Sequence, residues 1–196
     1  MRPIFTIHAG EFIFGEEVEK LDSRVRLWLP TKDTGVDFLL TSEGNENCVS
    51  VQVKMSRDYR PNSASSKFEE ALEAAGWFVF SAQKLKNSKA NVWSLVLVSR
   101  ERRSRPYFVN IPPAMLLKIL ESIHGKQDSY HLYVWILSKA KLYGDKKQSG
   151  RICIEGRKIK KTGKNEIAAG DYVFGDRDLT PYLDCWDFLT KLLVDE

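Results

Sequence analysis

Two apolar runs separated by a short polar turn occupy residues 36–54 and read VDFLL and CVSVQVK. This pattern is typical of a β-hairpin. If the turn is centred just after Gly44, antiparallel pairing places Asp37 opposite Gln52. Because side chains alternate along a strand, Gln52 and Lys54 share one face of the second run, and its three valines share the other. The sequence therefore predicts a valine face toward the core and a polar cluster of Asp37, Gln52 and Lys54.

Helical signals occur on both sides of this hairpin. The residues before it, 9–21, place Phe14, Val18 and Leu21 on one helix face. The segment 65–76 has a capping-box pattern at its start and Gly76 at its end, so a second helix is expected there. Further helices are predicted over 112–125, which opens with prolines and ends at a glycine, and from residue 180 to the C-terminus.

Strand signals fill most of the remaining chain. They are the segments 25–29, 77–82, 92–98, 107–111, 130–137 and, as a short strand, 151–155. The alternation of strands and helices predicts an α/β fold with a central mixed β-sheet flanked by helices. A chain of 196 residues that is 43% hydrophobic and 29% charged is expected to form one domain over residues 1–196.

Composition also restricts the compartment and the class of site. No apolar run reaches the roughly 18 residues of a membrane-spanning helix, and the N-terminus does not resemble a signal peptide, so a cytoplasmic protein without membrane contact is expected. The three cysteines are far apart and form no CxxC, which predicts buried reduced thiols. The five tryptophans stand mostly in apolar runs and are predicted to be core residues. We find no P-loop, dinucleotide fingerprint or GxSxG motif.

The polar end of the hairpin combines residue types that suit metal-dependent chemistry. Asp37 supplies a carboxylate for a hard cation such as Mg²⁺ or Mn²⁺, Gln52 a side-chain oxygen, and Val53 a backbone carbonyl. The Lys54 ammonium can position a water or stabilise charge that develops on a phosphate. We therefore predict a catalytic site at Asp37, Gln52 and Lys54, with Asp37, Gln52 and Val53 as metal ligands.

From about residue 8 to residue 82, this pattern resembles the PD-(D/E)XK nuclease superfamily, with its restriction-endonuclease-like core. Asp37 matches the metal-binding aspartate of that family, and Lys54 matches its lysine. Gln52 stands where Asp or Glu is usual, as in the QxK variant of Mrr-type restriction nucleases, and Val36 replaces the motif proline. The resemblance implies a Mg²⁺-dependent endonuclease, a hydrolase of phosphodiester bonds, whose metal affinity is weakened by the loss of one anionic ligand.

Many members of that superfamily use a further glutamate, on the first helix, as a catalytic metal ligand. Glu11 and Glu17 both flank the apolar stripe of residues 9–21, so helix periodicity does not choose between them. The position of Glu11, near the helix start and well ahead of the next strand, resembles the resolvase-like spacing better. We rank Glu11 first and Glu17 second.

Basic and polar residues near the hairpin are candidates for nucleic-acid binding. They are Ser56, Arg57, Arg60 and Lys67. A basic elaboration over residues 139–175 is either a solvated connector or a phosphate-gripping loop. The net charge of +4 permits binding to nucleic acid. His131, inside an aromatic strand, is predicted to be a packing residue.

Two functions therefore remain open. The first is a metal-dependent nuclease acting on nucleic acid, with DNA favoured over RNA, in restriction or antiviral defence or in DNA repair. A homodimer or a partner protein would then supply sequence specificity that a small domain lacks. The second is a catalytically inactive module of the same fold that binds nucleic acid or protein, with Gln52 as the mark of lost catalysis.

Overall fold

A computed structural model describes residues 8–31, 34–44, 47–56, 66–98, 105–156 and 174–193. Within these ranges the helices are α1 (Ala9–Leu21), α2 (Ser66–Ala71), α3 (Ala82–Lys86), α4 (Pro113–His124), α5 (Lys139–Tyr143) and α6 (Asp187–Leu193), with 3₁₀ turns η1 (Gly175–Arg177) and η2 (Thr180–Tyr182). The strands are β1 (Arg26–Trp28), β2 (Phe38–Thr41), β3 (Cys48–Ser56), β4 (Leu72–Ser81), β5 (Val92–Leu97), β6 (Tyr107–Ile111), β7 (Ser129–Ser138) and β8 (Arg151–Glu155).

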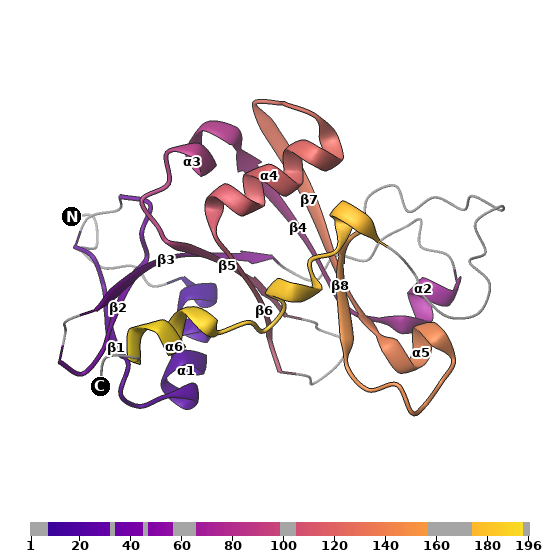
Figure 1. The fold of residues 1–196 in the computed structure, drawn as a ribbon, viewed down its shortest axis with the longest axis horizontal. Coiled ribbons are helices and arrows are strands. Elements are labelled where there is room, and N and C mark those ends of the chain that lie inside the picture. The colour runs from indigo at the N-terminus through magenta and orange to yellow at the C-terminus, as the bar shows by residue number, and fades with distance from the viewer. Residues whose placement is uncertain are drawn as a thin grey trace.

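The described strands form two sheets (Figure 1). The larger has the order β1-β2-β3-β5-β6; β3 and β5 are parallel, and its other neighbouring pairs are antiparallel. The smaller has the order β4-β7-β8 and is antiparallel throughout. The predicted α/β fold with a mixed central sheet flanked by helices is thus confirmed, with a second sheet that was not predicted.

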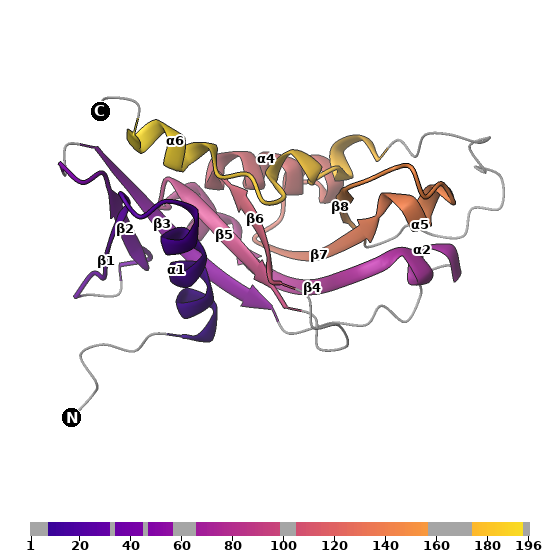
Figure 2. The same ribbon diagram turned by 90° about the horizontal axis from the view of Figure 1, so that it is seen from below.

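One apolar cluster joins the two sheets. It contains Phe78 and Phe80 from β4, Leu95 from β5, Ile111 from β6 and Leu120 from α4, among other buried residues. A second cluster covers the opposite face of the larger sheet, and both α1 and α6 contribute to it (Figure 2). Burial of apolar surface in these clusters is the main source of stability.

The second cluster bears out the predicted faces of α1 and of the hairpin. Phe14 and Val18 of α1 are fully buried and pack with Val51 and Val53 of β3, as the periodicity of each element predicts. Leu21 was expected on the same helix face, but its side chain is 46% exposed. The reason is that α1 ends at this residue, beyond the part of the helix that the sheet covers.

The predicted helix over 65–76 is wrong in its second half. Helix α2 ends at Ala71, and Leu72 already begins β4, which pairs with β7 from Leu72 to Ser81 with a register shift between Leu72 and Ala74. Gly76 lies inside this strand and does not cap a helix. A Cβ atom at Gly76 would lie 2.9 Å from Leu97 Cδ2 and 3.0 Å from Ser56 Cβ, so glycine permits the close approach of the two sheets. Tertiary pairing here overrides helix propensity.

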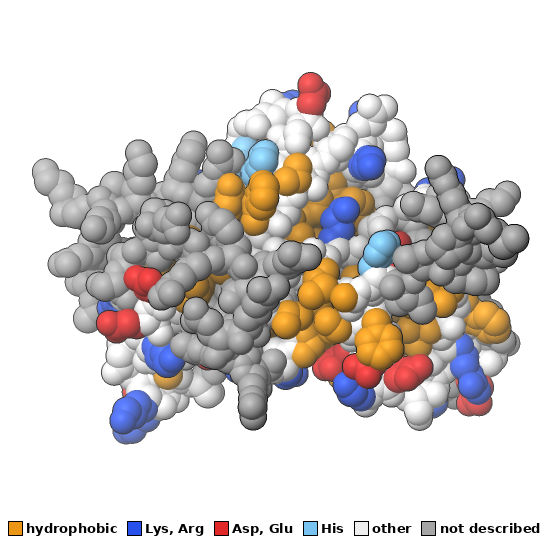
Figure 3. Space-filling view, turned by 180° about the vertical axis from the view of Figure 1, so that it is seen from behind, with side chains coloured by type: hydrophobic (Ala, Val, Ile, Leu, Met, Phe, Trp, Pro, Cys, Tyr) orange, Lys and Arg blue, Asp and Glu red, His pale blue; other side chains and the backbone are white. Residues whose placement is uncertain are grey.

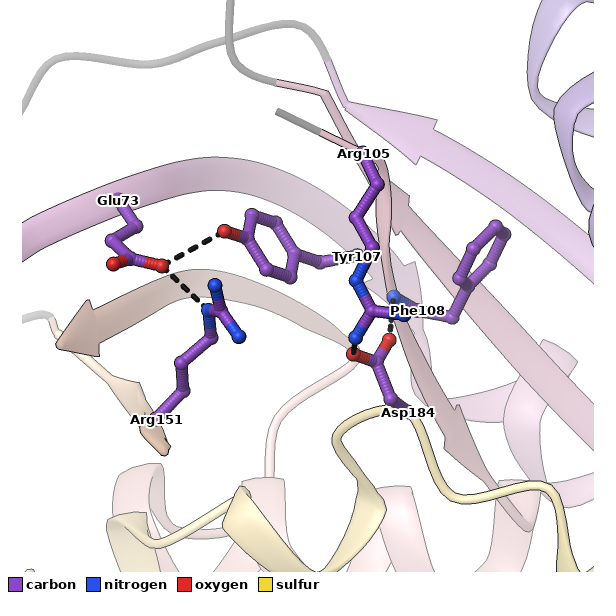
Figure 4. Close-up of polar contacts among 6 residues, drawn as sticks. All are labelled: Glu73, Arg105, Tyr107, Phe108, Arg151 and Asp184. Atoms are coloured by element: carbon purple, nitrogen blue, oxygen red, sulfur yellow. Dashed lines mark hydrogen bonds and ion pairs between the residues drawn. The ribbon is translucent and has the colours of Figure 1, made fainter. Parts of the chain in front are cut away.

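The predicted C-terminal helix is also shorter than expected. Residues 180–182 form only the turn η2, and α6 begins at Asp187. Between them Asp184 has a positive φ of 48° and bonds to β6. Its carboxylate accepts from the Phe108 backbone N–H (3.1 Å) and pairs with Arg105 (2.7 Å), as Figure 4 shows. These contacts hold the intervening segment against the sheet edge and keep it out of the helix.

The three cysteines differ in exposure. Cys153 is buried in β8, Cys185 is half-buried and Cys48 is exposed at the start of β3. The prediction of buried thiols is therefore wrong for Cys48, because this residue belongs to the turn end of the hairpin, which α1 does not cover. Among the described residues, no helix is long and apolar enough to cross a membrane.

Candidate functional site

The hairpin formed by β2 and β3 has the predicted register. Phe38 is paired with Val51, and the pairing continues to Thr41 and Cys48. Extension of this register by one residue places Asp37, which precedes β2, beside Gln52. The turn position read from the sequence was therefore right, and it sets which polar side chains meet at the end of the hairpin.

Asp37 is held by three successive residues of β3. Its backbone N–H donates to the Val51 carbonyl at 2.8 Å. Its carboxylate oxygen Oδ2 accepts from Gln52 Nε2 and from the Val53 backbone N–H, both at 2.7 Å. These are short, charge-assisted distances, so the half-buried carboxylate has a defined orientation. The predicted meeting of Asp37 and Gln52 is confirmed.

Lys54 follows Gln52 by two residues on the same face of β3. It lines a cleft of about 400 Å³ between the first turn of α1, the second half of β3 and the middle of β4. Its Nζ lies 5.6 Å from the centroid of the Trp93 ring, within the range of a cation–π interaction. The indole thus supports the ammonium from one side while the cleft gives it access to a ligand.

The two glutamates of α1 differ in their position relative to the cleft. Glu11 lines it together with His8, whereas Glu17 is not among its lining residues. The Glu11 carboxylate caps the helix by accepting from the His8 backbone N–H at 3.0 Å. Gly10 makes this placement feasible, because a Cβ there would lie 2.6 Å from Met55 Cβ. The helix start, with Glu11, can therefore lie directly against the end of β3.

The remaining walls of the cleft are mainly apolar. They are Val53, Met55, Trp77, Phe78 and Val79. Figure 3 views the molecule from behind. It shows hydrophobic side chains gathered across the middle of the face in view, with Lys or Arg and His side chains among them. Trp77 and Trp28 are 45% and 52% exposed, so the prediction that tryptophans are core residues is wrong for both. Each points outward because the alternation of its strand assigns it to the solvent face.

The donor set for a metal ion is small. No group of three His, Cys, Asp or Glu side chains that could hold a metal occurs within the described ranges. Asp37 and Gln52 are adjacent, but the amide nitrogen of Gln52 faces the carboxylate. Val53 likewise presents its N–H to Asp37. The arrangement offers one oriented carboxylate, that of Asp37, and one amide, that of Gln52. Rotation of this amide about its last torsion would present its oxygen in place of its nitrogen.

The residues predicted to contact nucleic acid lie in different environments. Ser56 is buried, and its hydroxyl accepts from the Trp77 backbone N–H at 2.8 Å, so it joins β3 to β4. Lys67 is exposed on α2. Arg57 and Arg60 lie outside the described residues, as does much of the basic elaboration, residues 157–173.

One described arginine of that elaboration has a structural partner. Arg151 pairs with Glu73 at 2.5 Å, and the same carboxylate oxygen accepts from the Tyr107 hydroxyl at 2.8 Å (Figure 4). Burial and the bond to Glu73 raise the pKa of Tyr107, and Glu73 also raises that of Arg151. This triad connects the two sheets. Its members are far apart in the sequence and form no motif, so no sequence signal identified it.

Comparison with models of known protein families, with curated proteins and with solved structures finds no match to this chain.

Proposed function

We propose that the protein is a metal-dependent endonuclease with a restriction-endonuclease-like core that hydrolyses phosphodiester bonds, preferably in DNA. The observation that carries this proposal is the contact between Asp37 and Gln52, with Lys54 two residues further on in a cleft that also contains Glu11. An oriented carboxylate, an amide, a second carboxylate and an ammonium from β3 and its neighbours could supply metal ligands and stabilise negative charge in such a hydrolysis.

The residues present fit a weakly held Mg²⁺ or Mn²⁺ ion. Mg²⁺ keeps several waters and commonly binds through one or two carboxylates together with phosphates of the substrate. Asp37 and Gln52 would hold the ion. Glu11, which lines the cleft with Lys54 whereas Asp37 and Gln52 do not, is the candidate for a further ligand. When bound, the ion would lower the pKa of a coordinated water and neutralise charge on the phosphate. This small donor set predicts that the ion binds more tightly in the presence of nucleic acid.

Lys54 has the role of binding and orienting the scissile phosphate. Its ammonium lies against the Trp93 ring, which limits its freedom, and its remaining side faces the cleft. A lysine in a partly apolar cleft attracts an anion more strongly than one in open water. The same ammonium stabilises the additional negative charge that forms on the phosphate during attack by water.

The alternative is a binding module of the same fold that does not cleave. One observation favours it: Asp37 Oδ2 already accepts two hydrogen bonds, and Gln52 supplies one of them through nitrogen. In such a module Gln52 would act as a permanent neutral partner of Asp37, and Lys54 would bind a backbone phosphate without turnover. The two functions differ in whether the nucleic acid is cleaved when a divalent cation is present.

The deciding experiment incubates the protein with supercoiled plasmid, linear duplex and single-stranded RNA in Mg²⁺, Mn²⁺ or EDTA. We expect cleavage of DNA with Mg²⁺ or Mn²⁺ and none in EDTA. Lys54→Ala should reduce the rate by about 100-fold or more, as expected for removal of one electrostatic stabiliser. The matched control is Lys118→Ala, which removes an exposed lysine on α4, away from the cleft.

Each outcome of this experiment supports or refutes one of the two functions. Cleavage in EDTA, or full activity of Lys54→Ala, would refute the proposed mechanism. DNA binding without cleavage under every metal condition would favour the binding module. Cleavage confined to RNA would keep the mechanism and change the substrate.

A further inference from the structure

The solvent face of the smaller sheet carries a row of aromatic rings next to the cleft. In the register of β4 and β7, Trp77 is paired with Tyr133 and Val79 with His131. Paired residues in an antiparallel sheet point to the same face, so these four side chains stand together. Trp77 is 45% and Val79 47% exposed, and both also line the cleft that contains Lys54.

The planes of the three rings are nearly parallel. Trp77 and His131 are tilted by only 12°, and Trp77 Nε1 donates to His131 Nδ1 at 3.1 Å. An indole N–H lies in the plane of its ring, so this bond sets the two rings edge to edge. Tyr133 is tilted by 18° from Trp77, with 6.3 Å between centroids. Trp77 is exposed while Tyr133 and His131 are half-buried, so the group meets solvent mainly through Trp77, whose indole N–H is already satisfied.

We propose that Trp77, Tyr133 and His131 form a stacking platform for an unpaired nucleobase. The inference rests on the proposed function, because the ligand is the nucleic acid whose backbone phosphate Lys54 binds. An exposed aromatic ring beside a cation matches a nucleotide, which combines a flat base with an anionic phosphate. An apolar protein partner would not require the cationic side chain that the cleft places beside Trp77.

This platform defines the substrate more narrowly than the proposed function does. A base inside a duplex has both faces covered by its neighbours and cannot stack on a protein ring. The preferred substrate is therefore DNA with a single-stranded segment, a frayed end or a base turned out of the helix. The His131 ring contributes as well: because its Nδ1 accepts from Trp77, its proton is on Nε2, where it can donate to a base or a phosphate.

The test measures binding in EDTA, where the proposed cleavage does not occur. Fluorescence anisotropy compares a short single-stranded DNA with a blunt duplex that contains it. We expect wild-type protein to bind the single strand more tightly. Trp77→Ala should weaken that binding by about tenfold or more while changing duplex binding little, since stacking on an aromatic ring is lost. Trp77→Phe, which keeps a flat ring, should retain most of the affinity.

Trp28→Ala is the matched control, because Trp28 is equally exposed but lies on β1, at the edge of the larger sheet. It should bind like wild type. In a Trp28→Phe background, single-stranded DNA should quench the emission of Trp77, the remaining exposed tryptophan among the described residues. Circular dichroism melting confirms that each variant is folded.

The outcomes separate this inference from the proposed function. Single-strand affinity that survives Trp77→Ala overturns the platform even if cleavage with Mg²⁺ is observed. Selective loss of that affinity supports the platform even if no metal produces cleavage. In that case the platform is part of the binding module. If sedimentation shows a dimer that Trp77→Ala dissociates, the surface binds a second copy of the chain and the inference is overturned.

Discussion

Gln52 donates its amide N–H to the carboxylate of Asp37 across 2.7 Å, from a strand position where a second carboxylate would face the first. The contact is set by the hairpin register, and the adjacent Val53 N–H donates to the same oxygen. A neutral amide therefore stabilises the carboxylate by hydrogen bonding, where Glu would repel it. This relationship determines how the site should respond to substitution and to divalent cations.

Gln52→Glu should make the fold dependent on divalent cations. The substitution replaces a donor by a second carboxylate, so in EDTA we expect a loss of about 1.5–3 kcal/mol in the free energy of unfolding. Mg²⁺ or Mn²⁺ should restore the lost stability by binding between the two carboxylates. Thermal melting of wild type and variant, with and without the cation, measures the effect. Equal responses of both proteins to the cation would show that Asp37 and residue 52 do not form a metal site.

Asp37→Asn and Asp37→Ala should separate the structural role of the side chain from its charge. Asn keeps an oxygen that accepts from Val53 N–H, whereas Ala leaves this N–H, in a buried residue, without that acceptor. We expect Ala to cost about 1–3 kcal/mol in urea unfolding and Asn clearly less. Both should abolish metal-dependent cleavage. A fully active Asp37→Asn variant would remove Asp37 from the set of metal ligands.

Arg177→Ala should strongly destabilise the smaller sheet. Glu155 is completely buried in β8, and its carboxylate pairs with Arg177, which follows in the turn η1. Removal of this cationic partner weakens the compensation of a charge held in a fully buried position, at a cost of up to about 3–5 kcal/mol. Urea unfolding measures it. The control Arg24→Ala breaks an exposed pair with Asp22 and should change stability little. Similar effects of the two substitutions would contradict the burial of Glu155.

The cysteines should differ in their reaction with iodoacetamide. Cys48 is exposed and should be alkylated first, whereas Cys153 should react only after unfolding. Burial, assisted by the charges of Asp178 and Asp184, raises the pKa of the Cys153 thiol well above 9.0. Mass spectrometry of peptides after timed labelling gives the order. Rapid alkylation of Cys153 at neutral pH would show that β8 opens readily.

The raised pKa of Cys153 also predicts a pH dependence of stability. Unfolding exposes a thiol that ionises near pH 9, while the folded state keeps it protonated to higher pH. Unfolding then releases a proton, so the free energy of unfolding should fall as the pH rises from about 8 to 10. Cys153→Ala should reduce this slope, whatever its own cost in packing. A slope unchanged by the substitution would exclude Cys153 as its source.

Local patterns were sufficient for the elements whose partners are near in sequence. The helix α1 and the β2–β3 hairpin follow from periodicity, and the position of the turn set the pairing of Asp37 with Gln52. The helix predicted over residues 65–76 failed because β7, some sixty positions away, pairs with Leu72–Gly76. Helix periodicity alone also left Glu11 and Glu17 equivalent.

The sequence by itself determined the hairpin register, and with it the contact of Asp37 with Gln52 and the position of Lys54 on the same strand face as Gln52, because alternation and turn position are local properties of the chain. Only the tertiary structure decided what surrounds these residues. It placed Glu11, and not Glu17, in the cleft with Lys54, turned the Gln52 nitrogen toward Asp37, buried Ser56 against β4 and exposed Trp77 beside the cleft. The burial of Ser56 and the exposure of Trp77 depend on how β4 packs across the end of β3, a long-range contact that no local pattern encodes.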